Sequence, residues 1–362
     1  MNWYNLSPAI GQISRAFGVN FAETSLLFSF FLFGAGTFQI PAGILATRIG
    51  SKKVAMSGLF VMAFTAILST FSPSYFALIT LRFITGFAAA FFFSSAIGIL
   101  NELYQRDITK MVGIYNGFFA IGGGVGIFLF TPIVNSMGWR MGFLIAGLVT
   151  LVVAAVTTYS LPKTRITGKF NMKAVTERLT DKTIWLVALG LDGLWGLNFT
   201  FSEYFKSYAI FIGQPEIIAG LMGGMILFLG IVGGYLTGAL RKYSPLRTVS
   251  ILTTIVGASI AVIPFLAGYT IWMPVILDGV FSVVIVSMEY GILIRLNKDP
   301  RYVPLSLGTV NSIQIGFGSL IPFAFAFLNK GNYTFSWIFL GLLSIVLLPL
   351  LWLELRNKHV ET

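Results

Sequence analysis

Cysteine is absent from this chain, and histidine occurs only once, at His359. A chain without cysteine forms no disulfides, thiolate metal sites or thiol redox centres, and a single histidine provides no cluster of metal ligands. Charged residues are also scarce, at 10% against about 25% in soluble domains. We therefore predict no cofactor and no metal site. Enzymatic activity is not expected either, because no constellation of a nucleophile with its base is visible.

Apolar residues make up 56% of the chain and form long runs. A helix needs about 20 apolar residues to cross about 30 Å of hydrocarbon. Lipid cannot satisfy free backbone polar groups, so each run is predicted to be a helix. The eleven complete runs cover residues 24–46, 54–71, 75–101, 111–134, 141–161, 183–212, 217–240, 248–267, 270–294, 303–328 and 333–353. The sequence thus predicts an all-α integral membrane protein.

The 24 lysines and arginines gather in alternate loops. The basic set comprises Arg48, Lys52, Lys53, Arg106, Lys110, Lys163, Arg165, Lys169, Lys173, Arg178, Lys182, Arg241, Lys242, Arg247, Arg295, Lys298, Arg301, Arg356 and Lys358. The other loops hold only Arg15, Arg140 and Lys330, with Lys206 near a boundary. Because short basic loops stay in the cytoplasm, we predict a multi-pass protein of the cell membrane with a cytoplasmic C-terminus. The net charge of +11 is explained by these basic cytoplasmic loops, which attract anionic membrane lipids. We do not predict binding to nucleic acid, because no soluble basic face is long enough to form.

The two halves of the sequence repeat. Residues 43–54 align with residues 238–249 at an offset of 195, and the same offset pairs Asn116 with Asn311. An internal repeat of this length predicts two homologous helix bundles. The predicted division is a first bundle at residues 1–161, a cytoplasmic linker at 162–182, a second bundle at 183–355 and a cytoplasmic tail at 356–362.

The first helix is predicted to be incomplete. At the same offset, the partner of the run that begins at Thr183 would begin before Met1. Met1 to Phe17 would then form only the outer part of a first helix. The complete protein would have two six-helix halves, and the sequence would start at an internal methionine. The alternative is a short first segment that lies at the membrane interface.

Three motifs, in this order and with this repetition, resemble the major facilitator superfamily of secondary transporters. The loop Gly43–Lys53 is similar to that family's G-x-x-x-D-R-x-G-R-K loop, with Thr47 in place of its aspartate. Residues 82–86 match R-x-x-x-G, and residues 138–140 read Gly-Trp-Arg. The resemblance covers the whole chain. It implies the family's fold of two pseudo-symmetric six-helix bundles, which work by alternating access.

The loop of the first motif is a candidate gate latch. Gly43 and Gly50 allow close backbone approach and a tight turn, while Arg48, Lys52 and Lys53 can hold helix carbonyl ends or lipid phosphates. In the resembled family the aspartate of this loop helps to lock one state, so Thr47 implies a weaker lock. The alternative is a basic membrane anchor without a role in gating.

Glycine is concentrated in the runs 111–134 and 217–240. Small residues let helices approach and slide, which predicts either a moving interface or ordinary close packing. The resemblance implies that these two runs meet across the halves, as do the runs 24–46 and 303–328. The run 111–134 lacks the Gly-Pro pair that marks antiporters in the family.

Charges inside membrane spans are costly and often functional. Away from span ends the chain has four: Arg82, Asp192, Asp278 and Glu289. Asp192 lies about 14 Å into its span, near the midplane where coupling ions bind, and is our candidate for proton coupling. The spacing places Asp278 and Glu289 within about 20° of one helix face. Glu203 and Lys206, three residues apart, are predicted to form an interfacial salt bridge.

Arg82 and Asp278 lie at nearly equivalent depths in the two halves. We predict one of two arrangements. Either the two residues pair with each other, or the planar guanidinium of Arg82 binds an anionic substrate through two parallel hydrogen bonds. A purely structural role is the alternative for each buried charge. Among polar residues, Asn116 and Asn311 are favoured because they repeat. The predicted substrate site therefore comprises Arg82, Asn116, Asp278, Glu289 and Asn311.

These observations predict a secondary active transporter for a small solute, with an organic or inorganic anion as the favoured substrate and protons as the coupling ion. The expected partners are that solute, membrane lipids and protons, and the expected state is a monomer. Proton-driven efflux of amphipathic compounds is the alternative within transport. A membrane sensor or receptor is the alternative outside it, although the linker and tail provide no sizeable soluble domain.

Overall fold

The computed structural model describes residues 1–104, 108–163, 172–240, 242–296 and 303–355, and these residues form helices without a β-strand. Several predicted cytoplasmic residues lie outside the described ones: Arg106, Arg165, Lys169, Arg241, Lys298, Arg301, Arg356, Lys358 and His359. The tail at 356–362 and part of the linker at 162–182 lie outside them too.

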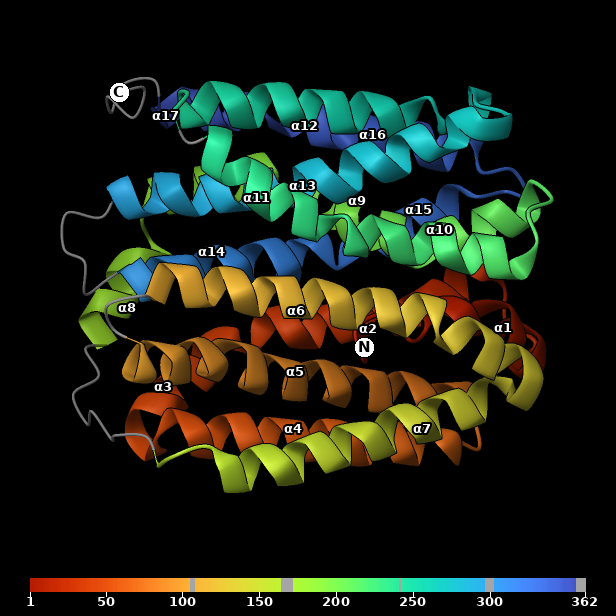
Figure 1. Cartoon of the computed structure of the whole chain (residues 1–362), viewed down its shortest axis with the longest axis horizontal. Coiled ribbons are helices and arrows are strands. Elements are labelled where there is room, and N and C mark those ends of the chain that lie inside the picture. Colours follow the sequence, from red (N-terminus) through yellow and green to blue (C-terminus); the bar gives the residue numbers. More distant parts are fainter. Residues whose placement is uncertain (105–107, 164–171, 241, 297–302, 356–362) are drawn as a thin grey trace.

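The helices run parallel to one another in a single bundle (Figure 1). The α-helices are α1 (Ile10–Phe17), α2 (Phe21–Thr37), α3 (Gln39–Ile49), α4 (Ser51–Thr70), α5 (Tyr75–Leu103), α6 (Ile108–Phe128), α7 (Phe130–Ser160), α8 (Met172–Leu179), α9 (Lys182–Phe211), α10 (Glu216–Phe228), α11 (Gly230–Leu240), α12 (Pro245–Ala261), α13 (Trp272–Leu296), α14 (Val303–Gly318), α15 (Leu320–Leu328), α16 (Thr334–Leu347) and α17 (Pro349–Leu355). Three short 3₁₀ helices are η1 (Ser7–Ala9), η2 (Ile263–Phe265) and η3 (Gly268–Ile271).

Every predicted apolar run is helical, which confirms the all-α membrane fold. By length and composition, eight of the described helices can cross a membrane, or nine if α2 and α3 count as one span bent by 43°. Two shorter apolar helices cover Ile114–Phe128 and Pro245–Ala261. The predicted runs 24–46, 111–134, 217–240, 303–328 and 333–353 each fall on two consecutive α-helices.

Proline explains three of the breaks between consecutive helices. Phe38, Leu129 and Ser319 separate helix pairs, and each stands three residues before Pro41, Pro132 or Pro322. A proline inside a helix lacks an N–H donor, and its ring clashes with the preceding turn. The carbonyls of that turn lose their partners, and the helix ends there.

The helices divide into a first group, α1 to α7, and a second group, α9 to α17. Within the first group α4 packs on α5 and α7, and within the second group α12 packs on α13 and α16. The groups lie one above the other in Figure 1 and meet through α2 with α14 and α15, and through α6 with α10 and α11. Both helix pairings that the family resemblance implied are therefore confirmed.

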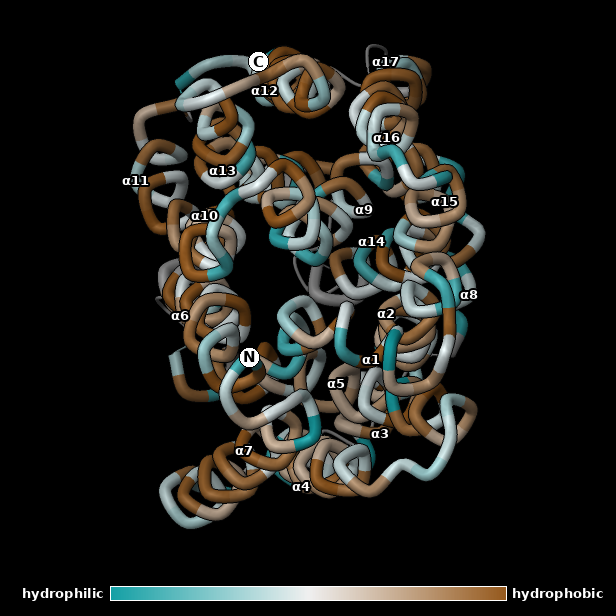
Figure 2. The backbone as a smooth tube through the Cα atoms, turned by 90° about the vertical axis from the view of Figure 1, so that its right-hand side faces the viewer, coloured by the Kyte–Doolittle hydropathy of each residue, from teal (hydrophilic) through white to brown (hydrophobic). Residues whose placement is uncertain are grey.

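Hydrophobic residues, brown in Figure 2, run along much of the length of the outer helices. Exposed examples are Phe64 on α4, Val152 on α7, Ile251 on α12 and Val346 on α16. These four helices carry no charge in the middle of their spans. Their composition is that of a lipid-facing surface.

The N-terminal segment enters the middle of the bundle, where Figure 1 marks its end. Residues 2–6 form turns, and the first α-helix begins only at Ile10. The prediction of one helix over Met1 to Phe17 is therefore wrong for its first residues. Gly18, at φ 64°, ends α1, and a capping box between Asn20 and Glu23 then begins α2.

Candidate functional site

Arg82 lies inside the first group with only 3% of its surface exposed. Its Nη1 donates to Asn5 Oδ1 over 3.5 Å, and its guanidinium lies 4.7 Å from the centre of the Phe31 ring. Its Nε and Nη2 have no hydrogen-bond partner. A buried guanidinium with unused donors is an unsatisfied cation, and such groups normally find an acceptor.

Asn5 reaches Arg82 because polar side chains hold the N-terminal segment in place. Asn2 donates to Thr150 Oγ1 on α7 over 2.7 Å, and Asn5 donates to Asn2 Oδ1 over 3.4 Å. The result is a buried polar chain that runs from α7 through residues 2 and 5 to α5.

Glu203 is the charge of the second group that interacts with Arg82. It lies fully buried on α9, both of its carboxylate oxygens lack a hydrogen-bond partner, and it attracts Arg82 electrostatically. The predicted interfacial salt bridge with Lys206 is wrong, because both residues are buried and Lys206 interacts with Glu216 instead. The reason is that α9 lies inside the bundle along most of its length, so that 72% of its most apolar 18-residue stretch is buried.

Asp278 does not pair with Arg82. Its Oδ2 accepts a hydrogen bond from Asn198 Nδ2 on α9 over 3.0 Å, and its Oδ1 has no hydrogen-bond partner. Tyr4 interacts with both Glu203 and Asp278. The pairing prediction failed because equal depth says nothing about which side of the helix a residue faces, and the N-terminal segment occupies the centre.

Glu289 and Asp192 form a second acidic region where α9, α13 and α14 meet. Glu289 Oε1 accepts from Gln314 Nε2 over 2.8 Å, and the carboxylates of Glu289 and Asp192 interact electrostatically. Asp192 Oδ1 has no hydrogen-bond partner and lies beside Gly318 on α14. Asp278 and Glu289 both face α9, in agreement with their spacing along α13.

The two repeated asparagines have different surroundings. Asn311 is buried on α14 and accepts from the Tyr290 hydroxyl over 3.1 Å. Asn116 is partly buried on α6, next to Tyr115, which interacts with Tyr290 across the two groups. Asn311 thus contacts Tyr290 itself, whereas Asn116 only follows Tyr115 in the sequence.

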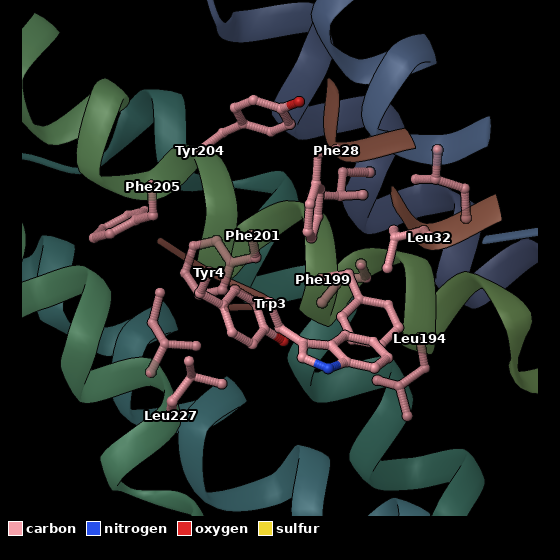
Figure 3. Close-up of a cluster of buried hydrophobic side chains, with 14 of the residues drawn as sticks. Trp3, Tyr4, Phe28, Leu32, Leu194, Phe199, Phe201, Tyr204, Phe205 and Leu227 are labelled. Carbon is pink, nitrogen blue, oxygen red and sulfur yellow. The ribbon is translucent and has the colours of Figure 1, made fainter. Parts of the chain in front are cut away.

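An aromatic cluster fills the centre between the groups (Figure 3). Trp3 stacks on Phe199 of α9 at 5.8 Å between ring centres and meets Phe31 of α2 edge-on at 5.1 Å. Phe119 of α6 lies 5.3 Å from the same indole. Sequence reasoning missed Trp3 and Tyr4 because it assigned residues 1–17 to a helix. The asparagines at positions 2 and 5, which flank these aromatic residues, were the available signal.

The loop of the first motif lies at the end of the bundle that we call the basic end. Gly50 adopts φ 96°, which requires glycine, and Lys52 donates to the carbonyl of Leu161 at the end of α7. Arg48 and Lys53 are exposed, and an added Cβ at Gly43 would meet open space. The Lys52 contact lies within the first group, so it joins two helices of that group.

Comparison with known proteins agrees with this geometry. The model of the Major Facilitator Superfamily matches residues 1–298. A probable nitrate transporter of Staphylococcus carnosus, NarT, is 23% identical over 378 residues, which cover 99% of this chain and 94% of the relative.

Two further relatives match over shorter stretches. A probable sulfoacetate transporter of Cupriavidus necator, SauU, is 28% identical over 41% of this chain and 34% of the relative. The 4-hydroxybenzoate transporter PcaK of Pseudomonas aeruginosa is 28% identical over 44% of this chain and 35% of the relative. Since the family model covers most of the sequence and the fold is all-helical, the chain belongs to the major facilitator superfamily.

Proposed function

We propose that the protein is a secondary transporter that moves a small organic or inorganic anion across the membrane by alternating access. The observation that carries this proposal is Arg82, a buried guanidinium whose Nε and Nη2 have no hydrogen-bond partner. A planar guanidinium presents its donors in a fork that suits carboxylates, sulfonates and nitrate. The names of the similar proteins support it, because nitrate, sulfoacetate and 4-hydroxybenzoate are all anions.

Other residues of the site would orient the anion. Asn116 and Asn311 offer amide donors near the contact between α6 and α13, and Tyr290 offers a hydroxyl. Asp278 and Glu289 already accept hydrogen bonds from Asn198 and Gln314. We assign to these two carboxylates a role in shaping the site and excluding wrongly placed anions.

Asp192 is the proposed proton carrier. Its Oδ1 has no hydrogen-bond partner, and it lies against Gly318 of α14, a helix that also packs on α2 of the first group. A proton bound there would offset the charge of an incoming anion. Because Asp192 lies against α14, binding of a proton to Asp192 would act on a helix that must move if the two groups rearrange.

Alternating access is proposed to work by motion of the two groups against each other. The backbones of α2 and α14 touch, since an added Cβ at Gly36 would lie 2.4 Å from Gly316 N, and Ser312 Oγ donates to the Gly36 carbonyl over 2.7 Å. We also propose the loop at Gly43–Lys53 as a latch at the basic end, a cytoplasmic location for that end, and a monomeric state.

Efflux of amphipathic cations is the second candidate. The aromatic cluster around Trp3 provides stacking surfaces, and the second group holds the buried carboxylates Asp192, Asp278 and Glu289. Such a combination favours organic cations.

Uptake into proteoliposomes distinguishes the two functions. The assay compares labelled nitrate, a sulfonate and an aromatic carboxylate with an amphipathic cation, with and without a pH gradient. We expect anion uptake, which Arg82→Gln lowers about tenfold to a hundredfold because hydrogen bonds to a charged group are lost. Arg82→Lys keeps the positive charge but lacks the paired N–H donors of the guanidinium, so it should recover only part of the rate of anion uptake.

Exposed charges provide matched controls. Arg140 is an exposed cation above Trp139, so Arg140→Gln should leave uptake unchanged. Asp192→Asn should remove the response to the pH gradient, whereas Glu216→Gln, at an exposed position, should not. Transport of the cation alone would reject anion transport in favour of efflux, and anion uptake that does not depend on Arg82 would reject Arg82 as the anion-binding residue.

A further inference from the structure

We propose that the polar chain from Thr150 through Asn2 and Asn5 holds the Arg82 guanidinium in one orientation, which selects oxyanions that present two oxygens side by side, such as nitrate and carboxylates. This inference rests on the proposed function, because it names the class of anion that Arg82 would bind. Thr150, Asn2 and Asn5 are positioning residues, since they act through Arg82.

The polar chain starts at a hydroxyl that can only accept from Asn2. Thr150 Oγ1 donates its one hydrogen to the Ala146 carbonyl over 2.7 Å. The hydroxyl oxygen is therefore an acceptor, and Asn2 Nδ2 donates to it over 2.7 Å. Thr150 and Asn2 are both buried, so water competes little for these two bonds.

This first bond sets the direction of both amides in the polar chain. A side-chain amide has its donors on nitrogen and its acceptor on oxygen. Because Asn2 turns its nitrogen towards Thr150, its Oδ1 is left to accept from Asn5 Nδ2 over 3.4 Å. Asn5 Oδ1 in turn accepts from Arg82 Nη1 over 3.5 Å. If the Asn5 amide were reversed, its N–H groups would face the N–H groups of the guanidinium, and two donors cannot bond.

A backbone turn over residues 1–5 brings the two asparagines together. The N–H groups of Tyr4 and Asn5 both donate to the Met1 carbonyl, over 3.0 and 3.1 Å. Residues three apart in such a turn lie on the same side of it, so Asn2 and Asn5 are neighbours. The backbone therefore places both amides on the path from α7 to α5.

Aromatic contacts of Arg82 restrict its orientation further. Its guanidinium carbon lies 4.7 Å from the centre of the Phe31 ring and 6.0 Å from that of Phe143. Phe31 is itself held by Trp3, which meets it edge-on at 5.1 Å. A guanidinium that has one nitrogen bonded and lies over an aromatic ring has little freedom to turn.

The nitrogens of Arg82 that have no hydrogen-bond partner are Nε and Nη2. In a guanidinium these two nitrogens share one edge, and their N–H bonds point the same way. This edge matches an anion with two oxygens side by side, whereas a halide offers a single atom to both N–H groups. Both nitrogens are buried, so an anion reaches them only after the surrounding helices move.

Nitrate and bromide separate the positioning of Arg82 from general damage to the site. Both are monovalent anions, but only nitrate presents two oxygens to the guanidinium edge. The assay measures uptake of labelled nitrate into proteoliposomes and its inhibition by bromide. Thr150→Val keeps the shape of threonine without the hydroxyl and should raise the KM for nitrate about threefold to tenfold, as for loss of one hydrogen bond. The maximal rate and the inhibition constant of bromide should change little, so the preference for nitrate falls.

Two substitutions in the same helix are the matched controls. Thr150→Ser keeps the hydroxyl and should restore the original KM for nitrate. Thr158 also donates to the carbonyl four residues earlier, over 2.7 Å to Ala154, but lies eight residues beyond Thr150. Thr158→Val should therefore leave nitrate uptake and bromide inhibition unchanged.

Asn5→Ala tests the other end of the polar chain. It removes the acceptor of Arg82 Nη1 and should raise the KM for nitrate at least as much as Thr150→Val does. Because both residues act through the same bonds, Thr150→Val should add little to the effect of Asn5→Ala. If Thr150→Val does not fold, which gel filtration reveals, Asn5→Ala provides the test.

The outcomes distinguish this inference from the proposed function. If nitrate is transported and its preference over bromide is unchanged in the variant that folds, the positioning role is wrong and anion transport stands. Equal weakening of nitrate and bromide would also overturn the inference, because it would mean general damage to the site. The aromatic carboxylate of the transport assay replaces nitrate if it is the anion transported. If neither anion is transported, the proposed function fails, and this inference fails with it.

Discussion

The boundary between the helix groups differs sharply between its two ends. Towards the Gly18 end the glycines are tightly enclosed: an added Cβ would lie 2.4 Å from Phe228 at Gly124 and 2.7 Å from Thr131 at Gly220. Towards the basic end, added Cβ atoms at Gly117 on α6 and at the exposed Gly234 and Gly238 on α11 would meet nothing within 4 Å. The same residue type therefore serves close packing at one end and leaves space at the other.

This difference shows that glycine content alone does not identify a packed interface. Helices α6 and α10 are in close contact. Helix α11, which continues α10 along the same span, contacts α6 much less extensively. A transporter that alternates between two states needs such an asymmetry, which reverses when the other end closes. The following predictions test whether the two ends really differ in this way.

The largest effect is expected at Gly36, in the packed region. A methyl group there would lie 2.4 Å from the backbone nitrogen of Gly316, so Gly36→Ala must push α2 and α14 apart. Overpacking of this kind costs about 1–3 kcal/mol. Thermal unfolding in detergent should show the loss.

Gly43→Ala is the control for that experiment, because Gly43 lies in α3, the continuation of α2, with open space around it. Alanine is favoured over glycine in a helix by up to about 1 kcal/mol, so stability should rise or stay constant. Equal destabilisation by both substitutions would mean that the two ends of this helix pair do not differ.

A bulky residue in the open region should affect transport and leave stability intact. A Cβ added at Gly117 would meet no atom within 4 Å in the present state, so we expect Gly117→Leu to change the melting temperature little. If the basic end closes during the cycle, the side chain will obstruct it, and transport should fall about tenfold or more. Normal transport would show that this part of α6 never becomes packed.

The smallest effect is expected at Lys52, where the basic end is held within one group. Lys52→Ala removes the hydrogen bond to the Leu161 carbonyl and should lower stability by about 1 kcal/mol. Lys53→Ala, at the adjacent exposed position, should have no measurable effect on unfolding. Transport that survives Lys52→Ala in full would argue against a latch at this loop.

Much of the fold was predictable because spans and turns have strong local signals. The apolar runs located the helices, and the family resemblance paired α2 with α14 and α6 with α10. The helix breaks were also available, since Pro41, Pro132 and Pro322 stand in apolar runs. Proline acts on its own helix, so sequence reasoning needs no neighbours to place such a break.

The site was less predictable because burial and pairing depend on neighbours. The spacing of Asp278 and Glu289 correctly placed both on one face, yet depth alone suggested a wrong partner for Arg82. Glu203 was assigned to an interfacial salt bridge from its position near a span end, although α9 is enclosed there as well. The turns at residues 2–6 had no periodic signal, so the segment that brings Asn5 to Arg82 could not be placed.

The helix breaks have a mechanical consequence. The four spans that make most of the contact between the two groups are each made of two pieces, divided at Phe38, Leu129, Leu229 and Ser319, whereas α4, α5, α9 and α13 run without interruption. Each divided span already lacks part of its internal hydrogen bonding, so a change of angle at the joint breaks few further bonds. These joints lie along the boundary between the groups, so bending at them would let one end of the bundle widen while the other stays closed.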